Sequence, residues 1–143
     1  MNAKWGKKPR EIFLSHSSRD RTFALRLARV LSDHGLPVWF SPTELVPAQE
    51  WHDEIGAALA RCDWFVVVVS PNAIKSQWVR RELVYALGDR RYGGRIVPVI
   101  RRTCNWRKLS WALPGLQKVD FTSGFAAGCR ELLAVWGKGY RGS

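Results

Sequence analysis

The stretch WFVVVVS, Trp64 to Ser70, decides the fold class of this 143-residue chain. Apolar side chains, most of them β-branched, occupy both faces of the stretch, and a strand of that kind is tolerated only where both faces are buried. Strands buried on both faces belong to parallel sheets that helices cover on each side. We therefore expect Trp64 to Ser70 to be a buried strand of such a sheet.

Segments on both sides of this strand repeat an order of strand and helix. The further strands that we predict are Glu11–Ser15, Leu36–Ser41, Arg95–Ile100 and Gln117–Phe121. The amphipathic helices that we predict contain Phe23–Leu31, Trp51–Cys62, Ser76–Leu87 and Phe125–Trp136. Pro98 indicates a bulge or a less central position for its strand, and residues 101–115 are expected to form loops with at most a short helix. The alternation predicts one α/β domain with a parallel sheet and helices on both faces.

The composition is that of one folded, basic domain. Apolar residues make up 46% of the chain, and eight residues are tryptophan, which excludes a disordered protein. The formal net charge of +11 permits contact with nucleic acid, an anionic membrane or a polyanionic cofactor. No helix-turn-helix, zinc-finger or aromatic RNA-binding pattern accompanies the charge, so we expect no specific nucleic-acid partner. Steep salt dependence of binding is the test of that alternative.

The cysteines and the apolar runs predict a cytoplasmic protein. Three widely separated cysteines without a CxxC pair argue for a reducing compartment and against both a disulfide framework and a metal site. No apolar run has the length of a membrane span or a signal sequence, so we expect no membrane partner. We divide the chain into a loose basic leader at 1–10, one domain at 11–136 and a flexible tail at 137–143.

Ligands of open parallel sheets bind outside the carboxyl ends of the strands. In this chain those ends carry Ser15 with His16, then Ser41, and then Ser70. Ser17 and Asp20 have the spacing of a capping box for the first helix. No GxSxG, P-loop or HExxH motif occurs, so acyl transfer at an elbow serine, nucleotide triphosphate hydrolysis and zincin chemistry lack support.

Two features outside these strand ends are assigned ordinary roles. The GxGxxG pattern at Gly137–Gly142 has no strand before it and no helix after it, so we assign it to the tail. His34 and His52 are expected at the surface.

One carboxylate lies beside the apolar stripe of a helix without a local cation. In SQWVRRELVYAL, Glu82 adjoins the stripe formed by Val79, Leu83 and Ala86, and no basic residue stands three or four positions away. Such a carboxylate is either solvated in a cleft at the sheet edge or paired with a distant cation such as Arg19. The spacing alone leaves both alternatives open.

Six motifs in order resemble those of a TIR domain, the Toll/interleukin-1 receptor module, and the bacterial form is the most similar. The motifs are FLSHSSRD, VWFSP, WHDEI, VVVVS, WVRREL and IVPVI, and the resemblance as a whole covers roughly Glu11 to Trp136. The resemblance implies a flavodoxin-like three-layer α/β fold with a central parallel five-stranded sheet and helices on both faces. This agrees with the architecture expected from the alternation of strands and helices.

The resemblance also implies an activity. Some TIR domains are non-catalytic scaffolds that signal by self-association, whereas others cleave NAD+ to nicotinamide and ADP-ribose or a cyclic isomer. The enzymes use the glutamate of a WxxxE segment, which Trp78 to Glu82 matches. The resemblance therefore implies an NAD+ nucleosidase in which Glu82 is catalytic and NAD+ is a substrate rather than a cofactor. Such a protein would act in bacterial immune signalling or NAD+ depletion, and self-association with other TIR domains would activate it.

The same resemblance assigns residues to the two sides of an NAD+ cleft. The loop Thr43 to Glu50 would be a mobile flap, with Trp51 near its end. Ser15, His16 and Arg19 would line the opposite side, where Arg19 faces the pyrophosphate. Trp78 would pack on the nucleotide or brace Glu82. Ser41 would also line the NAD+ cleft, but many NAD-cleaving relatives have an aspartate at this position, so the resemblance does not assign Ser41 the second polar contact to the ribose.

Overall fold

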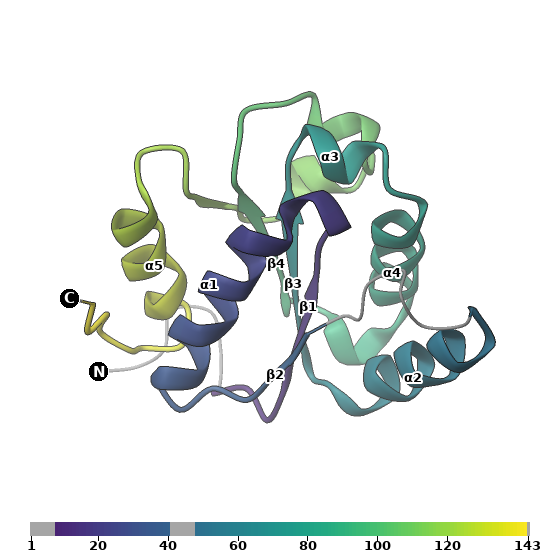
Figure 1. The fold of residues 1–143 in the computed structure, drawn as a ribbon, viewed down its shortest axis with the longest axis horizontal. Coiled ribbons are helices and arrows are strands. Elements are labelled where there is room, and N and C mark those ends of the chain that lie inside the picture. Colours follow the sequence, from purple (N-terminus) through teal and green to yellow (C-terminus); the bar gives the residue numbers. More distant parts are fainter. Residues whose placement is uncertain (1–7, 41–47, 143) are drawn as a thin grey trace.

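The computed structural model describes the backbone of residues 8–40 and 48–142, and the side chains of the same residues except 48–52. Within these residues, five parallel strands form one sheet in the order β2-β1-β3-β4-β5 (Figure 1). The strands are β1 (Ile12–Ser15), β2 (Val38–Phe40), β3 (Trp64–Val69), β4 (Ile96–Ile100) and β5 (Val119–Asp120). This order confirms the predicted flavodoxin-like α/β fold.

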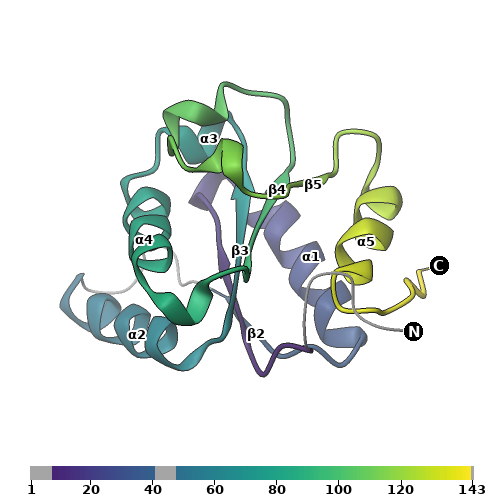
Figure 2. The same ribbon diagram turned by 180° about the vertical axis from the view of Figure 1, so that it is seen from behind.

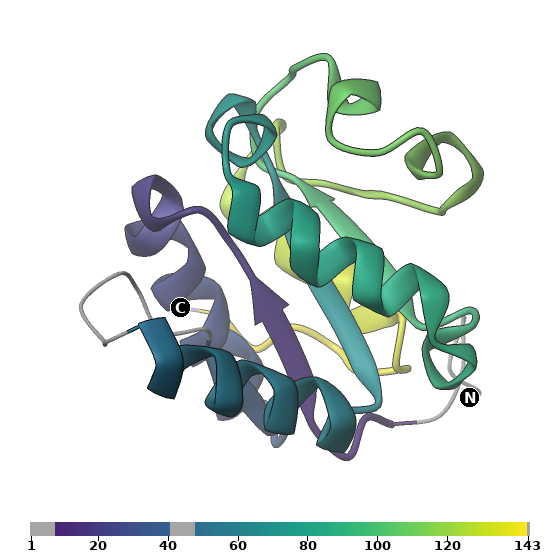
Figure 3. The ribbon, with the colours of Figure 1, turned by 90° about the vertical axis from the view of Figure 1, so that its right-hand side faces the viewer.

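Helices cover both faces of the sheet, as predicted. The α-helices are α1 (Arg21–Asp33), α2 (Ala48–Arg61), α3 (Pro71–Ile74), α4 (Gln77–Gly88) and α5 (Phe125–Ala134). The 3-10 helices are η1 (Ser18–Asp20), η2 (Arg90–Tyr92), η3 (Trp106–Lys108) and η4 (Leu113–Gly115). α1 and α5 lie on one face, and α2 and α4 lie on the other (Figures 1 and 3). No described helix is long and apolar enough to cross a membrane.

Strand β3 joins the two halves of the core. All six of its residues are buried, and it pairs with β1 on one side and β4 on the other. Trp64, Val66 and Val68 pack with α1 and α5. Phe65 and Val67 pack with α2 and α4, because successive side chains of a strand point to opposite faces. The prediction made from the stretch WFVVVVS is confirmed.

Of the two alternatives predicted for Pro98, the bulge is wrong and the less central position is confirmed, because β4 lies second from the edge of the sheet. β4 stays in continuous register with β3, and Pro98 lies opposite Val67. Arg101 donates its backbone N–H to Val69 of β3, and alternate residues of a parallel strand bond to the same neighbour, so the Pro98 nitrogen faces β5. β5 pairs with β4 only from Val99 onward. The missing N–H of the proline therefore interrupts no ladder bond.

Three local predictions differ from the structure. A separate short helix, α3, precedes α4; the Ser70 hydroxyl caps α3 and the Ser76 hydroxyl caps α4. The segment between β4 and β5 contains two 3-10 helices instead of at most one short helix, and it lies at the same end of the molecule as α3 (Figures 2 and 3). His34, expected at the surface, is buried: its Nδ1–H donates to the Val30 carbonyl at 2.7 Å, and its Nε2 accepts from the Arg141 N–H at 2.8 Å.

Gly128 in α5 touches an aromatic ring, which gives a first stability test. A Cβ at this position would lie 2.3 Å from ring atoms of Phe121, whose ring is itself packed edge-on against Phe23. Gly128→Ala is therefore expected to lower the free energy of unfolding by about 1–3 kcal/mol through overpacking. Gly56→Ala in α2 meets open space and is the control, expected to stabilise the helix by roughly 0.5–1 kcal/mol. Urea denaturation measures both, and equal effects would contradict the close packing at Gly128.

Candidate active site

The carboxyl edge of the sheet brings together residues from β1, β3 and α4. β1 ends at Ser15, which is followed by His16 and Ser17, and all three are buried. α4 lies over the same face as Phe13 and Phe65 and turns its inner side toward β1. The inner side of α4 carries Glu82 among apolar residues, because the helical repeat places it one turn from Val79 and Ala86.

Glu82 is a buried carboxylate held by a serine hydroxyl. Only 3% of Glu82 is exposed, and its Oε1 accepts a hydrogen bond of 2.6 Å from Ser15 Oγ, which is fully buried. No ion pair between described residues joins Glu82 to Arg19, the example of a distant cation considered from the sequence. Arg19 is exposed, and its backbone N–H donates to the Ser17 hydroxyl at 3.2 Å. The hydroxyl of Ser15 offsets part of the cost of burying the charge.

His16 is a neutral imidazole with an unused nitrogen. Its ring is 7% exposed and packs against Phe40 with 4.5 Å between ring centroids. Burial lowers its pKa from the usual 6.5 to about 4, so the ring is uncharged at neutral pH. Nδ1 has no hydrogen-bond partner among the described residues. A buried nitrogen in this state is able to make one hydrogen bond to a ligand at the sheet edge.

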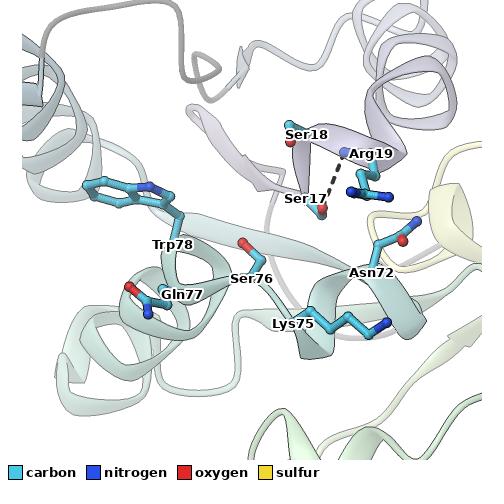
Figure 4. A pocket seen from close by; sticks show the side chains of 8 residues that line it. All are labelled: Ser17, Ser18, Arg19, Asn72, Lys75, Ser76, Gln77 and Trp78. Carbon is cyan, nitrogen blue, oxygen red and sulfur yellow. Dashed lines mark hydrogen bonds between the residues drawn. The ribbon is translucent and has the colours of Figure 1, made fainter.

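A polar pocket of about 500 Å³ opens between η1 and the start of α4 (Figure 4). It is lined by Ser17, Ser18, Arg19, Asn72, Lys75, Ser76, Gln77 and Trp78. Figure 4 shows the Arg19 and Lys75 side chains toward one end of the pocket and the Trp78 ring at the other. Among the described residues of the lining, two are cations and none is a carboxylate. Such a lining suits the phosphates of a nucleotide better than it suits a cationic or apolar group.

Trp78 lies one helical turn before Glu82 and joins the pocket to it. The indole is half-buried, and the Arg81 guanidinium lies 5.3 Å from its ring centroid. Because residues four apart lie on the same side of a helix, Trp78 borders the pocket while Glu82 lies deeper, next to Ser15. The structure thus brings Ser15, Trp78 and Glu82 to one region of the edge.

Asp20 is an important residue of this edge that the sequence did not single out correctly. Its carboxylate is 1% exposed and does not form the predicted capping box. It accepts hydrogen bonds from Ser70 Oγ at 2.5 Å and Asn72 Nδ2 at 3.1 Å, and it forms an ion pair with Arg101 at 2.5 Å. These partners follow β3 and β4, so Asp20 ties the loops after three strands together. It also fixes Asn72, which lines the pocket.

Part of the predicted cleft lies outside the described residues. Ser41 and the first residues of the predicted flap, through Pro47, are among these, and so is the side chain of Trp51. The backbone of the last flap residues belongs to α2, which begins at Ala48. The positions predicted for Ser41 and Trp51 in the cleft therefore stay predictions.

The family model of the TIR domain matches residues 12–133 of this chain. The match spans all five strands and α1 through most of α5, so the chain belongs to the TIR domain family. The fold is also that of the TIR domain of the Toll-related receptor TRR-2 from Hydra magnipapillata. The TM-score is 0.64 at 19% identity, over 77% of this chain and 82% of the receptor domain.

Curated relatives are distant and longer. The chain is 27% identical over 104 residues to the 2' cyclic ADP-D-ribose synthase BtTIR of Bacteroides thetaiotaomicron, covering 72% of this chain and 34% of that protein. It is 31% identical over 74 residues to the 2' cyclic ADP-D-ribose synthase AbTIR of Acinetobacter baumannii, covering 51% of this chain and 28% of that protein. The chain thus spans about a third of the length of these relatives or less, and it is a distant homologue of TIR enzymes that process NAD.

Proposed function

We propose that this chain is an NAD+ nucleosidase that cleaves the bond between nicotinamide and ribose. The observation that carries the proposal is Glu82, held by Ser15 in a buried position beside a cation-lined pocket at the carboxyl edge. The relatives named as 2' cyclic ADP-D-ribose synthases support it, since a cyclic ADP-ribose results when nicotinamide leaves NAD+ and another group of the same molecule bonds to the ribose carbon that nicotinamide has left. The product here is linear or cyclic ADP-ribose.

The chemistry requires only one carboxylate. When the glycosidic C–N bond breaks, its electron pair passes to the pyridinium nitrogen, and nicotinamide leaves as a neutral molecule. The leaving group needs no general acid, in contrast to the alkoxide released from a sugar. Positive charge develops on the ribose, and the Glu82 carboxylate stabilises it and hydrogen-bonds the ribose hydroxyls. The oxygen of a water molecule, or of another hydroxyl of the same ADP-ribosyl group, then bonds to this ribose carbon, and its proton passes to solvent.

The neighbouring residues supply contacts to the rest of NAD+. Arg19 and Lys75 are the cations of the pocket and are assigned to the pyrophosphate. His16 offers its free Nδ1 at the same edge. Trp78 positions Glu82 from the preceding turn and borders the dinucleotide.

Self-association is the second part of the proposal. α4 turns Glu82 inward but leaves apolar side chains on its outer side, with Val84 68% and Tyr85 44% exposed. An exposed apolar strip on a helix supports contact with a second TIR domain. A non-catalytic scaffold that signals by this contact is the alternative function, and it predicts association without turnover.

The experiment is incubation of the protein with NAD+ and separation of the products by chromatography. We expect release of nicotinamide in equal amount to ADP-ribose or its cyclic isomer. The rate per molecule should rise with protein concentration, because assembly completes the site. Association without nicotinamide release at high concentration would instead establish the scaffold.

A further inference from the structure

A second cavity, at the amino-terminal edge of the sheet, is lined mainly by arginines. Its volume is about 440 Å³. The charged residues that line it are Arg10, Arg61, Asp63, Arg90, Arg91 and Arg95. It lies at the opposite edge from Glu82, separated by the length of six-residue β3, which is roughly 20 Å. It is therefore distinct from the NAD+ site proposed above.

Parallel strand order explains why these residues meet. Arg10, Asp63 and Arg95 stand just before β1, β3 and β4, and the amino ends of parallel strands share one edge. Arg61 is the last residue of α2, and Arg90 and Arg91 belong to η2. Asp89 caps η2, and no further aspartate or glutamate occurs before Asp120 in the sequence.

Some of these arginines form ion pairs with acidic side chains, and others do not. Arg61 Nε donates to Glu11 at 2.7 Å, and Arg91 donates to Asp89 at 2.8 Å and to the Leu59 carbonyl at 2.9 Å. The Asp63 carboxylate accepts from the backbone N–H groups of Arg10 and Glu11 and lies 3.9 Å from the Arg95 guanidinium.

The guanidinium groups of Arg10 and Arg90 have no hydrogen bond or ion pair with any described residue. Five guanidinium groups thus face three carboxylates, which leaves two positive charges in excess.

We propose that this arginine cavity binds a chain of phosphates. Guanidinium groups bind phosphate oxygens through two parallel hydrogen bonds, and several guanidinium groups around one cavity suit an anion with more than one phosphate. No aromatic side chain is among the described residues of the lining, so the cavity recognises phosphates rather than bases. The phosphates belong either to a free polyphosphate group or to the backbone of a single-stranded nucleic acid.

The test compares two double variants of equal charge. Arg10→Gln with Arg90→Gln removes the two guanidinium groups that have no hydrogen bond or ion pair with a described residue. Arg29→Gln with Arg130→Gln removes two exposed arginines on α1 and α5. Tripolyphosphate binding is measured by calorimetry at low salt, and binding of a short fluorescent oligothymidylate is measured by anisotropy over a range of salt concentrations.

Arg90→Gln alone is the second variant, because its side chain is exposed and has no hydrogen bond or ion pair with any described residue, so its loss should not affect folding.

We expect the cavity variant to bind tripolyphosphate about tenfold more weakly, which corresponds to about 1.4 kcal/mol, while the control keeps the affinity of the wild type. The slope of log affinity against log salt for the oligonucleotide should fall by about two in the cavity variant. Tighter binding of the oligonucleotide than of tripolyphosphate identifies nucleic acid as the source, and the reverse identifies a free phosphate chain. Absence of binding of both probes at low salt, or an equal loss in the control variant, overturns the proposal.

Discussion

Glu82→Gln is expected to reduce nicotinamide release from NAD+ by about 100-fold or more, because it removes the negative charge proposed to stabilise the ribose cation. The amide keeps an oxygen that accepts the Ser15 hydrogen bond, so the fold should be retained. Product chromatography at a fixed, high protein concentration measures the loss, and thermal unfolding confirms that the variant is folded.

The matched control is Glu131→Gln, the same chemical change at an exposed position of α5. It should release nicotinamide at the wild-type rate. If Glu82→Gln retained full activity, another group would have to stabilise the developing charge. If both variants lost activity equally, the loss would reflect net charge or assembly rather than the site.

Asp20→Ala is expected to lower the free energy of unfolding by about 3–5 kcal/mol, since removing one partner of a buried ion pair leaves the other charge uncompensated. The variant leaves Arg101, Ser70 and Asn72 without the acceptor that they share. Urea denaturation measures the change, with Asp53→Ala, at an exposed position of α2, as the control.

The double variant Asp20→Ala with Arg101→Ala sharpens the test. The double variant should lower the free energy of unfolding by less than the sum of the two single variants. Each single variant leaves one buried charge without its partner, and the double variant removes both charges. If the changes in the free energy of unfolding were additive, Asp20 and Arg101 would not stabilise the fold through their ion pair. A loss below about 1 kcal/mol for Asp20→Ala would contradict a buried network and place the residue among ordinary surface carboxylates.

The sequence predicted the sheet because its signals are local. Trp64 to Ser70 is apolar on both faces wherever it is placed, and the alternation of strands and helices around it predicts a parallel sheet. The prediction from sequence was wrong where a residue could bond either to a neighbour in the chain or to a distant residue. The spacing of Ser17 and Asp20 fits a capping box, but the tertiary structure offers Asp20 stronger partners more than 50 residues away, at Arg101 and Asn72.

The candidate site was found only in part for the same reason. The position of Glu82 beside an apolar stripe was visible from helical spacing, but its partner was not. Ser15 lies 67 residues earlier, and only the pairing of β1 with β3 brings it under α4. The burial of His34 was missed because it depends on Arg141, which lies 107 residues further along the chain.

The position of β3 also governs how the domain reaches its native state. β1 pairs with β3 across about half a hundred residues, and β3 is the strand that joins the β2–β1 pair to the β4–β5 pair. Closing such long loops before any contact compensates for their entropy makes folding slow in comparison with helical bundles of the same size. During synthesis, β1 and β2 emerge first and expose unpaired strand edges until Trp64–Val69 leaves the ribosome. Chains that stop short of β3 should therefore aggregate rather than form a smaller domain.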